Sequence, residues 1–172
     1  MATYKSHDPR LRLTKQFGGA LLKKSNAKTA RPVSVKHGMH VVLKSSQASG
    51  GWSFRRIENS KKIQSILYSQ AQKYGVRIQE VAKSSDHLQL IVKIKNREAF
   101  NAFMRAISGM IAMAVTGAAK TRALKTKFWD YRPWTRIVEI LKKYSLVADE
   151  SIQQFLISIN IISQAPEALS SA

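Results

Sequence analysis

The sequence predicts an α+β fold in which an antiparallel β-sheet carries two helices on one face and is followed by an additional C-terminal helix. Short apolar runs rich in β-branched residues alternate with longer segments whose apolar residues recur at helical spacing. The 172 residues are enough for one domain with its own hydrophobic core. The chain has no cysteine, which excludes disulfides, zinc–thiolate sites and cysteine nucleophiles.

Four segments are predicted to be strands. Residues 40–44 form a short apolar run that is typical of a buried strand. Residues 76–83 and 87–95 follow each other with the turn residues Ser-Ser-Asp between them, which predicts a hairpin. A last strand is expected within residues 128–138, centred on Thr-Arg-Ile-Val.

Three segments have the periodicity of helices. Residues 60–74 carry a stripe of apolar side chains, with a polar N-cap at 59–60 and a stop at Gly75. Residues 97–119 form a longer apolar stripe. Residues 144–162 are predicted to form the final helix, which has acidic residues in or near its first turns, as the helix dipole favours.

The predicted order β-α-β-β-α-β, followed by one more helix, matches the ferredoxin-like arrangement. In that arrangement two helices cover one face of the sheet and leave the other face available. We therefore expect three parts: a flexible basic arm at residues 1–36, a ferredoxin-like domain at 37–143, and a C-terminal helix and tail at 144–172. Many functions use this fold, so it does not decide what the protein does.

The charge of the chain is strongly positive, with 29 Lys and Arg against 10 Asp and Glu and a formal net charge of +19. The charge is also uneven, because residues 1–36 hold nine basic residues and one acid, whereas no basic residue follows Lys143. Such a charge predicts binding of a polyanion through its phosphates, on the part of the chain that precedes Lys143.

The sequence gives no sign of a membrane protein. The first residues have no apolar segment that resembles a secretory signal. The longest uncharged apolar run, residues 106–119, is too short to cross a bilayer and is interrupted by Ser, Thr and Gly. We expect a soluble cytoplasmic protein that is associated with the bacterial nucleoid and has no membrane partner.

The run Asp86-His-Leu-Gln-Leu-Ile-Val92 is the most specific motif of the chain. Side chains two apart on a strand share a face, so His87 and Gln89 can point together at one metal ion or one phosphate. The alternation predicts that Leu88, Leu90 and Val92 lie on the opposite face. His40 could lie near His87 if the first and third strands are neighbours, and would then be a supporting ligand.

The motif strand, the helix after it and the later Lys-Phe-Trp-Asp and Thr-Arg-Ile-Val segments resemble a known family. The sequence is similar, over roughly residues 35–154, to the REP-associated and insertion-sequence tyrosine transposases, which are HUH single-strand DNA endonucleases. The resemblance implies cleavage and joining of single-stranded or hairpin DNA, with Mg²⁺ or Mn²⁺ at the site, and a homodimer. Family members carry His-hydrophobic-His at this strand, so Gln89 replaces the second His.

In the resembling family, the final helix supplies a nucleophilic tyrosine and, one turn later, an amide that completes the metal site. The resemblance places the amide near Gln153 or Gln154, and the tyrosine position, four residues before Gln154, at Glu150. A carboxylate there would give a labile acyl phosphate in place of a phosphotyrosine. Tyr144 is the nearest tyrosine in this region but lies ten residues before Gln154, about 15 Å along a helix and out of phase with it. We therefore expect cleavage to be impaired or absent.

Cations interleaved with aromatic residues mark the predicted nucleic-acid surface. Charges of this kind bind phosphates, and exposed rings stack on bases. We expect Phe54 and Trp134 to belong to the core. The predicted nucleic-acid-binding residues are Lys44, Arg55, Arg56, Lys61, Lys93, Lys95, Lys120, Arg122, Lys125, Lys127 and Trp129.

Three functions remain open at this point. The first is a transposase-like single-strand DNA endonuclease that uses His87, Gln89 and Gln154 around a divalent ion. The second is a DNA-binding protein derived from such an enzyme and without turnover. The third is an RNA-binding module on the same type of sheet, although the aromatic signature expected of such modules is absent from the first and third strands.

Overall fold

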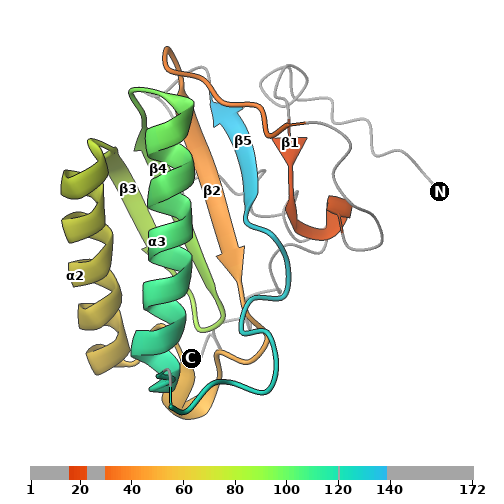
Figure 1. Cartoon of the computed structure of the whole chain (residues 1–172), viewed down its shortest axis with the longest axis vertical. Coiled ribbons are helices and arrows are strands. Elements are labelled where there is room, and N and C mark those ends of the chain that lie inside the picture. The colour runs from red at the N-terminus through yellow and green to blue at the C-terminus, as the bar shows by residue number, and fades with distance from the viewer. Residues whose placement is uncertain (1–15, 23–29, 120, 139–172) are drawn as a thin grey trace, which may run out of the picture.

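The structure is a computed structural model of the chain and describes residues 16–22, 30–119 and 121–138. These residues form a five-stranded antiparallel sheet in the order β1-β5-β2-β4-β3, with helices α2 and α3 packed against one face (Figure 1). In chain order the elements are β1 (Gln16–Phe17), η1 (Gly19–Leu22), β2 (Gly38–Lys44), η2 (Gly50–Trp52), α2 (Ile57–Tyr74), β3 (Arg77–Lys83), β4 (His87–Lys93), α3 (Arg97–Thr116) and β5 (Trp134–Val138).

The predicted α+β fold is confirmed. Without β1, the strand order is β5-β2-β4-β3, in which β2 and β4 are central neighbours, as the ferredoxin-like arrangement requires. The predicted final helix at residues 144–162 lies outside the described residues.

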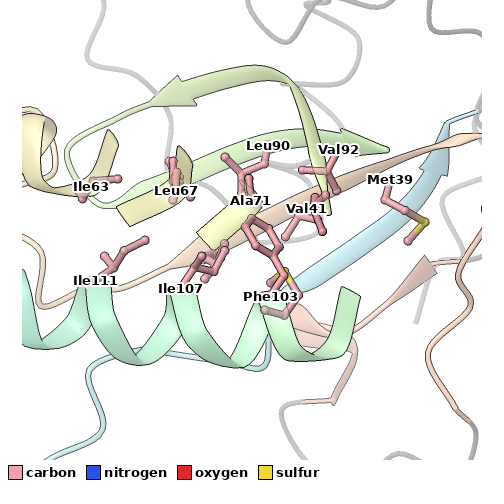
Figure 2. Packing of buried hydrophobic residues seen from close by; sticks show 14 of the residues in the cluster. Met39, Val41, Ile63, Leu67, Ala71, Leu90, Val92, Phe103, Ile107 and Ile111 are labelled. Atoms are coloured by element: carbon pink, nitrogen blue, oxygen red, sulfur yellow. The ribbon is translucent and has the colours of Figure 1, made fainter. Parts of the chain in front are cut away.

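The core lies between the sheet and the two helices, where aliphatic residues from every layer meet (Figure 2). Val41 of β2 and Leu90 of β4 point from the sheet toward the helices. Leu67 of α2 and Ile107 of α3 pack against them from the helix side, and all four residues are fully buried. Among the described helices, α3 has a length and apolar composition that would suit a bilayer, but its apolar stripe belongs to this core.

The first helix ends where predicted and begins three residues early, whereas the second begins where predicted, at Arg97, and ends early. Gly75 and Gly117 end α2 and α3 in the left-handed conformation, at φ of 62° and 68°. The second helix therefore ends at Thr116 and not at residue 119. The first helix begins at Ile57, so Asn59 is not its cap. Its side chain donates instead to two backbone carbonyl oxygens of the preceding loop, both at 2.9 Å.

Part of the segment predicted as a basic arm is ordered against the sheet. Gln16 and Phe17 form the edge strand β1, which pairs with β5. Gly18 follows at φ 86°, and a Cβ atom there would lie 2.2 Å from the carbonyl oxygen of Pro133. Only glycine allows the two backbone segments to come this close. A backbone hydrogen bond of 2.8 Å from the N–H of Gly19 to the carbonyl oxygen of Arg132 holds them together.

Arg31 also anchors this segment. Its guanidinium donates to the carbonyl oxygen of Pro133 and to the hydroxyl of Thr135, both at 2.9 Å, and lies 4.8 Å from the centre of the Phe17 ring. Burial, and the nearby charge of Arg132, lower the pKa of Arg31 to about 10. This cation of the predicted arm therefore holds the edge of the sheet together.

Candidate nucleic-acid interface

The two residues of the central motif lie on the sheet face opposite the helices, as the alternation predicts. Leu88 and Leu90 enter the core, and His87 and Gln89 point the other way. Both polar residues are nevertheless buried, since His87 keeps 8% and Gln89 2% of its surface exposed. The described residues therefore do not leave this face open to nucleic acid at the motif, although His87, at the start of β4, keeps more of its surface exposed than Gln89 does.

A carboxylate orients the ring of His87. Asp86 Oδ1 lies 2.9 Å from Nδ1 of His87, at the turn that joins β3 to β4. This hydrogen bond, aided by the charge of Lys44 and opposed by burial, holds the pKa of the Asp86 carboxyl below its usual value. Because Nδ1 donates to an ionised carboxylate, the lone pair of the neutral ring is on Nε2. Metal-binding histidines in proteins are commonly held in this way.

Gln89 is directed along the sheet toward His40 and away from His87. Its Oε1 lies 3.1 Å from Nε2 of His40, which must donate the hydrogen because the amide oxygen is an acceptor. His40 pairs with Ile91, two residues beyond Gln89 on the side away from His87. The first and third strands are thus neighbours, as expected, but His40 supports Gln89 and is about 13 Å along the strand from the level of His87.

A buried arginine accompanies His40 on this face. Arg136 of β5 pairs with His40 and keeps only 2% of its surface exposed. Its guanidinium lies 6.0 Å from the ring centre of Trp134, and the His40 ring meets the same indole edge to face at 5.3 Å. Burial first, and then the charge of Arg136, lower the pKa of His40 to about 3 despite the hydrogen bond to Gln89, so His40 is neutral.

The loop before β5 is tied to the end of β2, beside His87. Asp130 accepts three hydrogen bonds from the backbone and hydroxyl of Ser46, between 2.9 and 3.0 Å, and its own backbone N–H donates to the carbonyl oxygen of Lys44. The side chain of Gln47 donates to the carbonyl oxygen of Lys127. These contacts fix residues 127–130 at the end of the sheet where β4 begins, which we call the His87 end.

Several of the predicted cations gather at the His87 end. Lys44 pairs with His87 across the strands. A backbone hydrogen bond of 2.9 Å from Phe54 to Ser85 brings the exposed Arg55 and Arg56 to the same turn. Lys61 is exposed near the start of α2, and Lys125 and Lys127 are exposed on the loop that is tied to β2.

Other predicted residues lie elsewhere or have structural partners. Lys93 is the last residue of β4, about 20 Å along the strand from His87, and Lys95 follows it; both are exposed. Arg122 donates to the carbonyl oxygen of Gly117 at 2.6 Å and so closes the end of α3. Trp129 is half-buried, packs edge to face on Phe128 at 5.0 Å, and donates from Nε1 to the carbonyl oxygen of Ser108. Phe54 and Trp134 are buried, as predicted.

The remaining predicted site residues are outside the described part of the chain; they are Lys120, Tyr144, Glu150 and Gln154. Sequence reasoning did not single out Arg136, Asp130 or Ser46. Arg136 had no signal of burial, because a charged residue in a strand normally predicts an exposed position.

Comparison with known proteins assigns the family. The description "Transposase IS200 like" belongs to the family model that matches residues 38–153, about two thirds of the chain. The chain belongs to the IS200-like transposase family. The match spans the sheet from β2 to β5, both helices and the His87 end, so the predicted resemblance is confirmed and DNA is the partner that the family implies.

Other comparisons add little to this assignment of the transposase family. A solved structure described as a candidate transposase from Deinococcus radiodurans R1 has 14% sequence identity and a TM-score of 0.47, and covers 77% of this chain and 98% of its own. A search of curated proteins finds no match.

Proposed function

We propose that this transposase-family protein binds single-stranded or hairpin DNA at the His87 end and acts on it by metal-assisted strand cleavage and joining. The observation that carries the proposal is the His87 ring, whose Nδ1 is held 2.9 Å from Asp86 so that Nε2 is the reactive nitrogen. Lys44 pairs with His87 and Arg55 lies at the same turn, so a phosphate near Nε2 would meet positive charge.

The donors of the motif are of the right kind for a hard divalent ion. An imidazole nitrogen from His87 and an amide oxygen from Gln89 would hold Mg²⁺ or Mn²⁺, with Gln154 as the third ligand. Within the described ranges, no cluster of three His, Cys, Asp or Glu residues offers an alternative site. The ion would supply polarisation of the DNA phosphate. Gln89 would have to share its oxygen with His40 or turn away from it to act as a ligand.

The chain's own residues would prepare the site. Asp86 keeps the His87 ring in one tautomer and orientation, which lowers the cost of ordering it when DNA or metal binds. Asp130 and Ser46 hold the loop with Lys127 against the same end, so its charge is already in place. We further propose that the protein acts as a homodimer in the cytoplasm, where its DNA is found.

A second candidate function is DNA binding without turnover. It is favoured by the hydrogen bond between Gln89 and His40, which gives the amide a structural task that needs no metal. It is also favoured by Glu150, a carboxylate at the position where the family's tyrosine is expected.

The test uses a labelled single-stranded oligonucleotide with a hairpin, incubated with Mn²⁺ and the full-length protein. If the first function holds, wild type cleaves it, slowly because Glu150 stands at the tyrosine position, and His87→Ala binds it without cleaving. His37→Ala is the matched control, because His37 precedes β2 at the opposite end of the sheet and should leave cleavage unchanged.

The outcomes separate the candidates. Binding without cleavage by wild type, with affinity that falls steeply as salt rises, would favour the second function. Equal cleavage by wild type and His87→Ala would contradict the proposed site. Stronger competition by an RNA hairpin than by the DNA hairpin would instead indicate an RNA-binding protein.

A further inference from the structure

A groove of about 640 Å³ lies between the second half of α3 and the loop that leads to β5. The segments that line it, the C-terminal half of α3 and the loop before β5, lie near the His87 end on the helix side of the sheet (Figure 1). They are separate from the face that carries His87 and Gln89. Its size falls in the range of pockets that bind small organic groups.

One wall of the groove is aromatic and held in place. Trp129 donates from Nε1 to the carbonyl oxygen of Ser108 at 2.9 Å, and its ring packs against Phe128 and Phe54 at 5.0 and 5.8 Å. Tyr131 follows on the same loop and also lines the groove. A flat group that entered would therefore meet rings that need little reordering.

Another part of the lining is made of small residues. Ser108, Gly109 and Ala112 present the surface of α3 to the groove. A Cβ atom added at Gly109 would meet no other heavy atom within 4 Å, so the space beside the helix is open. This wall allows a planar ring to approach the helix closely.

The rim of the groove is positively charged. Lys127 and Arg132 line it and are both exposed. The one carboxylate in the lining, Asp130, is occupied by three hydrogen bonds from Ser46. A group with a flat apolar body and a negative charge beside it fits this combination.

We propose that this groove binds one unstacked base of the DNA strand, with the base against Trp129 and Tyr131 and its flanking phosphates at Lys127 and Arg132. The proposal rests on the proposed function, because it assigns a base-binding subsite to the same nucleic-acid interface. Stacking on aromatic side chains is tolerant of sequence and adds affinity for each base that stacks.

The test fills the groove without disturbing the fold. Gly109→Leu places a side chain in the open space beside α3, and replacing a helical glycine should leave the protein at least as stable, which a urea titration checks. Ser65→Leu is the matched control, because it adds the same side chain at an exposed position of α2.

Each variant is titrated with a single-stranded DNA oligonucleotide and with an abasic strand of equal length, which keeps the phosphates and lacks the bases. We expect wild type and Ser65→Leu to prefer the normal strand, and Gly109→Leu to reduce that preference about tenfold, the loss expected for one stacked base. Binding of the abasic strand should be equal in all three proteins.

Two results would contradict base binding in the groove, and a third would contradict the proposed function on which it rests. If Gly109→Leu keeps the full preference for the normal strand, or if wild type binds both strands equally, no base occupies the groove. If wild type binds neither strand, the proposed function fails and the inference fails with it.

Discussion

Replacing Gln89 by Leu tests which task this residue performs. Gln89 accepts a hydrogen bond from His40 at 3.1 Å, and the two side chains keep 2% and 0% of their surface exposed. Leucine has a similar volume, so little cavity forms, but the N–H of His40 loses this acceptor in a buried position. An unsatisfied buried donor costs about 1–3 kcal/mol of unfolding free energy.

The free energy of unfolding is measured by urea titration at neutral pH and checked by thermal unfolding. For a chain of this length, the loss corresponds to a fall in melting temperature of about 2–12 °C. Gln79→Leu is the control, since Gln79 is exposed on β3 and its replacement should change stability by less than about 0.5 kcal/mol.

A double-mutant cycle identifies the partner. If the hydrogen bond is the main effect, the losses from Gln89→Leu and His40→Leu should not add, and their coupling should be about 1–2 kcal/mol. Strictly additive losses would refute the assignment of Gln89 to His40. The amide would then be available to a metal ion without competition.

Three further predictions concern His40, the sheet edge and the cations. Burial and Arg136 lower the pKa of His40 to about 3 from 6.5, so the unfolded chain gains its proton first as pH falls. Stability should therefore decrease by up to about 1.4 kcal/mol per pH unit between pH 6.5 and about 3, and urea midpoints at pH 6.5 and 4.5 should differ less in His40→Phe than in wild type. Gly18→Ala should destabilise by about 1–3 kcal/mol or release β1, because its Cβ would lie 2.2 Å from a carbonyl oxygen; unchanged amide exchange of Phe17 and unchanged stability would argue against this. Lys44→Gln should weaken DNA binding and reduce the slope of log affinity against log salt concentration by about one unit. Lys93→Gln, at the opposite end of the sheet, should change affinity and slope less. A larger effect of Lys93→Gln, in affinities measured across a salt series, would place the interface at the opposite end.

The element order could be predicted because each strand and helix carries its own periodicity. The run from His87 to Leu90 alternates polar and apolar residues, and the structure places Leu88 and Leu90 in the core as that alternation predicts. Gly75 ends its helix where the sequence predicts, since glycine adopts the left-handed conformation without strain. The start of that helix was less predictable, because the side chain of Asn59 bonds to the preceding loop and does not cap the helix.

The features that sequence patterns did not predict depend on contacts between distant segments. Two residues are too few to show the alternation of a strand, so β1 carries no signal of its own. The burial of Arg136 and His40 arises on a face that a polar alternation normally assigns to solvent. The hydrogen bonds between Asp130 and Ser46 join residues 84 positions apart, which no local pattern reveals.

The most direct test of the central claim is to locate bound DNA on the sheet. A single-stranded oligonucleotide that carries photoreactive 5-iodouracil is crosslinked to the protein, and the attached residues are identified by mass spectrometry. We predict crosslinks at the His87 end, on residues 54–56, 84–88 and 127–132. Crosslinks confined to residues 73–77 and 93–97, at the opposite end, would contradict it.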